Sequence, residues 1–362
     1  MDAPSKRLKL LLVEPKRCKK YYTSYPPLAL LKLAAYHRRR GDEVKLVSDV
    51  LPDGFDPDVI CVTSLFTYAW EPVHNAINLC LDKYPQAEVK VGGIYATLCA
   101  DNLRQTFGDR IEIHGGLLEE VEDILPDYSL CPDWQASIVF SSRGCVNNCE
   151  FCSVAALEPE FRARKSIKNL IYQGHRKVVL WDNNFLASPY HEDILRELEE
   201  IGLEVDFNQG LEAQRLTREI VGQLAKLNIS FVRLAYDVKQ NKEHVRSAVE
   251  LLKQAGFRGR RICVYCLYNH SDSPDDFLQR IRDLLGWGVV AYPMRYEPLK
   301  PGSKNSYVSP KWTAEQLDLV VKARRVIGYG GAFPPYQKLK EKFDTAASFE
   351  EAFGLRPRKD RG

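Results

Sequence analysis

The sequence predicts a two-domain α/β protein, in which an open parallel sheet is followed by a partial barrel of six βα units and a C-terminal extension. Its 362 residues are too many for one ordinary core and indicate two domains. Short apolar segments alternate with amphipathic helical segments along most of the chain, which is the pattern of parallel sheets covered by helices. We expect domains at 1–125 and 126–300, and an extension, helical then irregular, at 301–362.

The composition excludes several classes of protein. With 45% hydrophobic and 27% charged residues, the chain is globular and not disordered. A net charge of +3 gives no strong basic field, so we expect no nucleic-acid partner. No apolar run approaches the roughly 18–20 residues that span a bilayer, and no signal peptide is evident, so we expect no membrane partner and a cytoplasmic location. Ten cysteines in so long a chain indicate a reducing compartment and not a disulfide framework.

The first domain is expected to be a Rossmann-like open sheet. A helix is expected at 28–40 because its apolar residues have helical spacing and Gly41 is a usual helix terminator. A second helix is expected at 72–83. The expected strands are 9–14, 43–47, 59–63, 88–91 and 110–114. Ligands of such sheets bind over the carboxyl ends of the strands. The candidate binding residues at those ends are Ser64, Leu65, Gly92, Gly93, His114 and Gly115.

A short acidic stretch with Pro126 and Pro132 is the expected linker to a second βα series. Its strands are expected at 137–141, 177–181, 204–208, 230–236, 261–267 and 289–294. Helices are expected between them, for example at 191–201 and 242–255, and a further helix at 314–327. Six such units make a partial barrel, and barrels of this kind carry their functional groups at the carboxyl ends of the strands.

The most informative feature is a group of three cysteines within eight residues, Cys145, Cys149 and Cys152. They follow directly on the first strand of the second series. Three thiolates in one short loop can converge on a soft metal. A zinc site would usually need a fourth ligand and two separated pairs, whereas a [4Fe–4S] cluster held by three cysteines keeps one iron open for another ligand. Zinc, or a loop of incidental cysteines, is the alternative.

The spacing Cys-x3-Cys-x2-Cys, with Phe151 just before the last cysteine, resembles the signature of the radical S-adenosylmethionine superfamily. The resemblance implies a [4Fe–4S] cluster whose open iron is chelated by S-adenosylmethionine. It also implies reductive cleavage to a 5′-deoxyadenosyl radical, with a reductant protein such as flavodoxin or ferredoxin as partner. A dry barrel suits such chemistry because it shields the radical from water.

The resemblance also suggests residues that contact S-adenosylmethionine. They are Phe151, Asp182, Asn183, Gln209, Glu212, Arg233 and Tyr236, on the cysteine loop and on the second to fourth strands or just after them. The segment after the second strand departs from the Gly-Gly-Glu form of many members. Asp182 and Asn183 are the candidates in this segment because a carboxylate and an amide accept hydrogen bonds from an ammonium group. Cys263 and Cys266 are expected on opposite faces of a strand and therefore as core residues. Arg295, Tyr296 and Glu297, at the end of the last strand, are candidates for substrate contact.

The first domain resembles the cobalamin-binding domain that precedes the barrel in one class of this superfamily. The matching segments include Tyr25-Pro26-Pro27-Leu28, Gly41-Asp42-Glu43-Val44 and Val91-Gly92-Gly93-Ile94. The Asp-x-His-x-x-Gly motif that supplies a cobalt ligand in cobalamin mutases is absent, because residues 14–18 read Glu-Pro-Lys-Arg-Cys. The resemblance therefore implies cobalamin bound with no protein ligand on cobalt. The alternative is a domain that holds no cofactor.

Together the resemblances imply a cobalamin-dependent C-methyltransferase that acts on an unactivated carbon. The first expected substrate is a protein or peptide residue, such as a glutamine of methyl-coenzyme M reductase, with small natural products as the next. An aromatic and proline-rich wall for a peptide is expected from Tyr329, Phe333, Pro334, Pro335 and Tyr336. The alternatives are a radical enzyme without methyl transfer, which cyclises, oxidises or rearranges a small molecule, and an iron–sulfur binding or sensor protein.

Overall fold

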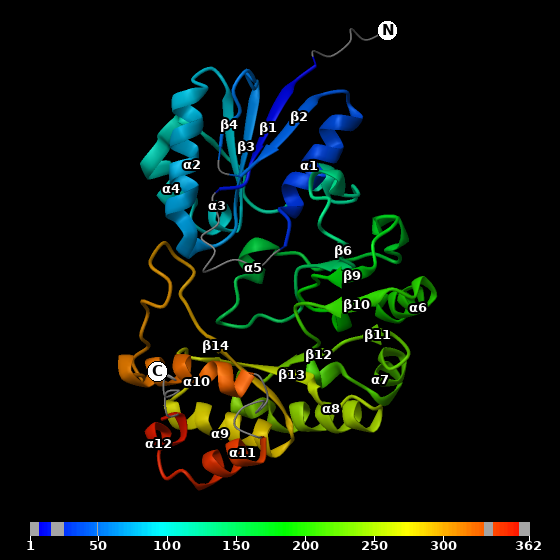
Figure 1. Ribbon diagram of the computed structural model, residues 1–362, viewed down its shortest axis with the longest axis vertical. Helices are drawn as coiled ribbons and strands as arrows, with labels where there is room; N and C mark the ends of the chain where they lie inside the picture. The colour runs from blue at the N-terminus through cyan, green and yellow to red at the C-terminus, as the bar shows by residue number, and fades with distance from the viewer. Residues whose placement is uncertain (1–6, 16–24, 49, 329–335, 355–362) are drawn as a thin grey trace, which may run out of the picture.

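The computed structural model describes residues 7–15, 25–48, 50–328 and 336–354. It is an α/β protein built mainly on parallel sheets, as the sequence predicts (Figure 1). One sheet with its helices lies at the top of the view, and the elements from β6 onward lie below it. Within the described residues, none of the helices combines the length and the apolarity needed to cross a bilayer.

The first sheet is parallel throughout and has the strand order β2-β1-β3-β4-β5. Its strands are β1 (Lys9–Val13), β2 (Glu43–Val47), β3 (Val59–Ser64), β4 (Glu88–Gly93) and β5 (Glu112–Ile113). Its helices are α1 (Leu28–Arg39), α2 (Trp70–Lys83), α3 (Ile94–Leu98) and α4 (Ala100–Phe107). This is a doubly wound order, whose switch point lies between β1 and β3. Strand β5 is shorter than the predicted 110–114, and a 3₁₀ turn, Gly108–Arg110, takes up the first of those residues.

Strand β1 explains why the sequence of the first strand is continuously apolar. Leu11 and Val13 pack into the core on the α2 side of the sheet, whereas Leu10 and Leu12 pack with Leu30 of α1 on the other side. Both faces of the strand are therefore buried, and neither face selects polar residues.

The second βα series follows in the expected chain order, but its strands pair in separate groups. The order is β11-β10-β9-β6 in one group and β12-β13-β14 in another, and both groups are parallel. The strands are β6 (Ala136–Val139), β9 (Lys177–Leu180), β10 (Glu204–Phe207), β11 (Asn228–Ile229), β12 (Val232–Ala235), β13 (Gly259–Tyr268) and β14 (Val289–Arg295). The covering helices are α6 (His191–Ile201), α7 (Arg218–Leu224), α8 (Lys242–Gln254) and α9 (Pro274–Gly286).

The single strand expected at 230–236 is wrong in one respect. Only Val232–Ala235 of it forms a strand, β12, which pairs with β13, and a separate short strand that was not predicted, β11, precedes it and pairs with β10. The seam between the groups is crossed by a backbone hydrogen bond from Leu211 N to Arg233 O (2.9 Å) and by the ion pair of Arg233 with Asp206. A buried ion pair therefore links β10 to β12 where the sheet ladder is interrupted.

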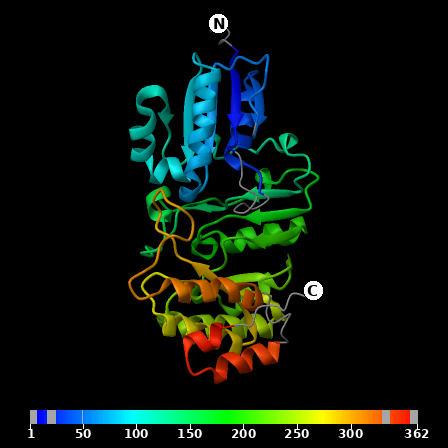
Figure 2. The same ribbon diagram turned by 60° about the vertical axis from the view of Figure 1, so that its left-hand side comes forward.

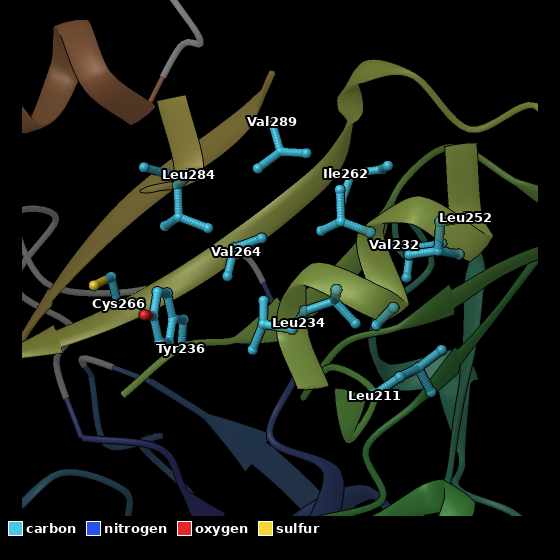
Figure 3. Packing of buried hydrophobic residues seen from close by; sticks show 14 of the residues in the cluster. Leu211, Val232, Leu234, Tyr236, Leu252, Ile262, Val264, Cys266, Leu284 and Val289 are labelled. Atoms are coloured by element: carbon cyan, nitrogen blue, oxygen red, sulfur yellow. The ribbon is translucent and has the colours of Figure 1, made fainter. Parts of the chain in front are cut away.

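Alternation along β12 and β13 separates the core from the opposite face of these strands. Figure 3 shows Leu234 of β12, and Tyr236 just after it, in one apolar cluster with Val264 and Cys266 of β13. Because successive side chains of a strand point to opposite faces, Cys263 lies on the other side from Cys266. Cys266 is a core residue, as predicted, whereas Cys263 is half-buried and lies outside the core cluster.

The C-terminal extension contains more helix than expected. Helix α10 (Ala314–Gly328) packs on β14, and α11 (Tyr336–Thr345) and α12 (Phe349–Phe353) pack against α9. The expected irregular tail is therefore wrong for α11 and α12, which form because their apolar residues join the core of the second series. Tyr336 begins α11 and donates its hydroxyl to the Leu285 carbonyl. The other members of the expected aromatic wall, Tyr329, Phe333, Pro334 and Pro335, lie outside the described residues.

The two parts of the chain meet at the carboxyl ends of the first sheet. Helix α3, which follows β4, contacts α5 (Val154–Leu157), the short helix after the third cysteine. The segment after β14 also reaches the first domain, where Lys304 Nζ lies 4.8 Å from the centre of the Tyr68 ring. Figures 1 and 2 show this segment, in orange, extending from β14 to the helices of the first sheet.

We predict that Gly93→Ala destabilises the first domain strongly. Gly93 has φ +105°, and a Cβ there would lie 2.2 Å from the Ser64 carbonyl oxygen, so alanine adds both strain and a clash at a cost of about 3 kcal/mol or more. Gly92→Ala is the matched control, because its Cβ would meet the nearest atom at 3.8 Å, and we expect a change within about 1 kcal/mol. Denaturant unfolding measures both; equal losses would contradict the prediction.

Candidate functional site

The cysteine loop begins at Gly144, directly after the short strand β7 (Ser142–Arg143), which pairs antiparallel with β8 (Arg162–Ala163). Gly144 has φ +72°, and a Cβ at this position would lie 2.4 Å from the Glu160 carbonyl oxygen. Only glycine avoids this contact with the returning chain. The Gly144 N–H donates to Glu158 Oε2 at 2.7 Å, which fixes the start of the loop.

The three cysteines of the loop carry free thiols, and Cys149 and Cys152 are exposed. Burial raises the pKa of Cys149, and the neighbouring Cys152 and Cys145 raise it further, so the three thiols are electrostatic neighbours. In the described part of the chain, no group of three or more His, Cys, Asp or Glu side chains is close enough together to hold a metal ion. The donor set suits a soft metal, but the thiols would have to approach one another to bind it, which their place on one exposed loop permits.

Glu212, which follows β10, joins the cysteine loop to the ends of two strands. Its carboxylate accepts hydrogen bonds from Asn147 Nδ2 of the loop (3.1 Å) and from Asn184 Nδ2 after β9 (2.7 Å). It also accepts from Arg215 Nε (2.5 Å) and from Gln214. Burial alone would raise the pKa of Glu212, but these hydrogen bonds lower it below its ordinary value. Glu212 is therefore an ionised acceptor at the edge of the loop.

Asn184 has a buried acceptor at the same place. The residue is 5% exposed, and its Nδ2 lies 3.8 Å from Cys145 Sγ as well as on Glu212. Its Oδ1 has no hydrogen-bond partner among the described residues, and neither has the buried Nε1 of Trp181 on the same segment. A buried amide oxygen without a donor is costly, so Asn184 Oδ1 is an acceptor suited to an N–H group of a ligand.

Asp182 and Asn183 form hydrogen bonds with residues that flank the loop. Asp182 is almost fully buried and accepts from Ser141 Oγ (2.6 Å), Ser142 Oγ (2.7 Å) and Ser141 N (3.2 Å). Burial raises its pKa, and these hydrogen bonds oppose the rise. Asn183 Nδ2 donates to Glu158 Oε2 at 3.0 Å. Both side chains therefore fix the chain leading into the loop, and Asn184, which is not among the residues predicted from the sequence, presents the open acceptor.

The other predicted contacts of S-adenosylmethionine are spread over different surroundings. Gln209 is exposed after β10, and Arg233 is buried in its ion pair with Asp206. Tyr236 lies apart from the loop: it belongs to the core cluster, where its hydroxyl donates to Asp283 of α9 (3.1 Å) and its ring stacks on Trp287. The structure therefore brings Asn183 and Glu212 to the cysteine loop and does not bring Tyr236 there.

Asp237, the next residue after Tyr236, lies on the side of the cysteine loop and not in the core cluster. It is an electrostatic neighbour of Cys149, and it accepts a hydrogen bond from Leu267 N at 3.0 Å. Burial raises its pKa. The alternation of a strand is the signal that could have identified Asp237, because an apolar environment for Tyr236 places its neighbour on the opposite face.

Aromatic contacts connect the loop to the last strands. Phe151 packs edge-on against His270 at 5.8 Å, and His270 packs against Tyr296 at 4.6 Å. Arg295 Nη2 donates to the Tyr307 carbonyl (2.6 Å), and its Nε lies 3.5 Å from Glu297 Oε1. Burial raises the pKa of Glu297. Of the predicted substrate residues, Tyr296 is therefore linked to the cysteine loop through the ring of His270.

The predicted ligand residues of the first domain lie together at the ends of β3, β4 and β5, which are neighbours in the sheet. Ser64 Oγ donates to the Gly92 carbonyl (2.7 Å), and Ser64 packs against Gly93. Leu65 is 43% exposed, and a Cβ on Gly115 would meet no described atom within 4 Å. His114 Nε2 lies 3.2 Å from the Leu117 carbonyl. Residues 16–18, within the segment that lacks the cobalt-ligating motif, lie outside the described residues.

Comparison of the sequence with protein-family models and with curated proteins gives no match. The functional conclusion therefore depends on the residues of the chain itself and on their placement.

We predict that the Glu212 network weakens on acidification. The pKa of Glu212 is lower in the folded protein than in the unfolded chain, where it is about 4.3. The stabilisation that Glu212 contributes is therefore complete above about pH 4.3 and is lost as the pH falls through the pKa of the folded state. The difference in unfolding free energy between wild type and Glu212→Gln should be large at pH 7 and shrink near pH 3. Glu199→Gln, on the exposed surface of α6, should show little difference at pH 7. A Glu212 difference that grew on acidification would refute this.

Proposed function

We propose that the chain is a cobalamin-dependent radical S-adenosylmethionine enzyme that methylates an unactivated carbon. The observation that carries the proposal is the placement of the three-cysteine loop. It follows the first strand of a parallel βα series, with Asn184, Glu212 and Asp237 from the ends of three further strands around it. The carboxyl ends of a second parallel sheet lie next to it, since α3 contacts α5.

In this proposal Cys145, Cys149 and Cys152 hold a [4Fe–4S] cluster, which supplies the electron for reductive cleavage of S-adenosylmethionine. Asn184 Oδ1, buried and without a described partner, would accept a hydrogen bond from an amino N–H of S-adenosylmethionine. Glu212 keeps Asn184 in place through the hydrogen bond to its Nδ2. A reductant protein such as flavodoxin or ferredoxin approaches the exposed side of the loop at Cys149 and Cys152.

Cobalamin is proposed at the carboxyl ends of the first sheet. Support comes from the exposed Leu65, which offers an apolar contact, and from the open space beside Gly115, where backbone can approach a bulky ligand. When bound, cobalamin supplies a transferable methyl group. The substrate is proposed to be a protein or peptide residue, or a small molecule, held near Arg295, Tyr296 and Glu297.

One observation favours the second candidate, a radical enzyme without methyl transfer. Gly93, which resembles a cofactor-binding glycine, is already required by its contact with Ser64. Packing of the sheet therefore accounts for Gly93 without any cofactor, and a first domain that holds no cobalamin is compatible with it.

We predict that Cys145→Ala, Cys149→Ala and Cys152→Ala each abolish the uptake of iron and sulfide and the formation of 5′-deoxyadenosine after anaerobic reconstitution. Each substitution removes one of the sulfur ligands from a site that has three. Cys131→Ala, outside the loop, is the control and should behave like wild type. Iron and sulfide analysis with chromatography of the nucleoside products measures both. A wild-type protein that takes up zinc, or no sulfide, would refute the proposed cluster.

We predict that Gly115→Phe weakens cobalamin binding about 10-fold or more, because the ring occupies space that the ligand needs at a cost above about 1.4 kcal/mol. Gly222→Phe, at an exposed position of α7, should bind like wild type. Visible absorption of anaerobic protein titrated with cobalamin measures the affinity. If wild type releases 5′-deoxyadenosine but binds no cobalamin and forms no S-adenosylhomocysteine, the second candidate function replaces the first.

A further inference from the structure

A buried ion network leads from helix α1 of the first domain to the cysteine loop. Its centre is Arg143, the residue before Gly144. Arg143 donates to Glu122 through Nε (2.7 Å) and Nη2 (2.9 Å), and its Nη1 donates to Glu158 Oε1 (3.1 Å). The three side chains are only 12–15% exposed. One guanidinium therefore ties together the linker, the strand β7 and the chain that returns after Cys152.

The second carboxylate oxygen of Glu158 connects the network to the first residue of the loop. Oε2 accepts from the backbone N–H of Gly144 (2.7 Å) and from Asn183 Nδ2 (3.0 Å). Asn183 stands beside Asn184, whose Nδ2 lies 3.8 Å from Cys145 Sγ. The orientation of Glu158 therefore affects the position of the first residue of the loop and of the segment that contacts Cys145.

Lys32 connects the network to the first domain. This residue of α1 is 7% exposed, donates from Nζ to the Glu122 carbonyl (2.7 Å), and lies 3.6 Å from Glu122 Oε2. Burial lowers the pKa of Lys32 to about 8, against the attraction of Glu122. Burial would raise the pKa of Glu122, but Arg143 and Lys32 lower it, so Glu122 is the anion shared by the two domains. Arg164 Nη2 also lies 3.7 Å from Glu122 Oε1, so removing the carboxylate leaves three cations without their common anion.

A neighbouring glutamate–arginine pair makes the same kind of ion pair but is not connected to the loop. Glu119, three residues before Glu122, receives both Nη atoms of Arg162 (2.8 and 3.0 Å) on β8, directly opposite Arg143 in the hairpin. Glu119 and Arg162 are 61% and 46% exposed. An exposed pair of this kind contributes little, so it is the matched control.

We propose that Glu122 is a positioning residue for the cysteine loop, acting through Arg143 and Glu158, and that Lys32 makes the loop geometry depend on the docking of the first domain. This inference depends on the proposed function, because it takes the loop to hold the cluster. Residues that orient metal ligands from outside are known to matter as a class. The network occupies that position here without touching a cysteine.

The test compares Glu122→Gln with Glu119→Gln in the full-length protein, after anaerobic reconstitution of each. Electron paramagnetic resonance of the reduced cluster, with and without S-adenosylmethionine, reports the loop geometry, and 5′-deoxyadenosine formation reports activity. We expect Glu122→Gln to change the spectral response to S-adenosylmethionine and to slow the reaction about 10-fold or more. Glu119→Gln should stay within about 2-fold of wild type, since its pair is exposed. Lys32→Met should change the spectral response in the same direction as Glu122→Gln.

Each outcome bears on a different claim. If Glu122→Gln and Glu119→Gln are indistinguishable while wild type is active, the positioning role is overturned and the proposed function stands. If Lys32→Met matches wild type, the coupling to the first domain is overturned. If Glu122→Gln does not fold, Arg143→Lys replaces it, because lysine keeps the charge but not the two-pronged contact; wild-type spectra for this variant would overturn the role. Wild type without iron and sulfide would instead remove the proposed function.

Discussion

The need to satisfy buried carboxylates sets the course of the chain around the cysteine loop. Glu158 lies just after the loop and Glu212 lies beyond β10, and each accepts N–H groups from segments far apart in sequence. Asp182 accepts hydrogen bonds from the hydroxyl groups of Ser141 and Ser142, the two serines before the loop. A carboxylate removed from water is costly unless such donors surround it. The loop between these acceptors is therefore held at its base, while its outer cysteines stay exposed.

The ends of the strands supply these groups because the sheets are parallel, so that all their carboxyl ends meet at one edge. The interruption between β11 and β12 changes this arrangement only locally. Asp206 and Arg233 face each other across it, and Lys177 Nζ lies 3.2 Å from Asp206 Oδ2. Where ladder hydrogen bonds are missing, charged side chains hold the strands together. They also give this face of the strands a polar lining opposite the apolar cluster of Figure 3.

The first domain contributes more than a separate sheet. Tyr25, just before α1, packs against the rings of Trp134 and Trp181, and its hydroxyl accepts from Asn208 Nδ2 at 2.8 Å. Leu28 of α1 shares a small core with β6 and β9. Together with Lys32, these contacts place the start of α1 against the second βα series. The packing of α1 and the geometry of the second βα series are therefore physically connected.

The sequence by itself determined the α/β class and most strands and helices, and it identified the cysteine loop as the candidate site, because these follow from local periodicity, glycine positions and spacing. Only the tertiary structure decided the separate strand β11 before β12, the helices α11 and α12, and which polar residues meet the loop. Asp182 and Tyr236 have the right chemistry but are committed to Ser141 and Asp283, whereas Asn184 keeps an open oxygen. The sequence shows which polar groups a side chain has. Whether those groups are free to bind a ligand depends on partners from distant segments, which only the tertiary structure shows.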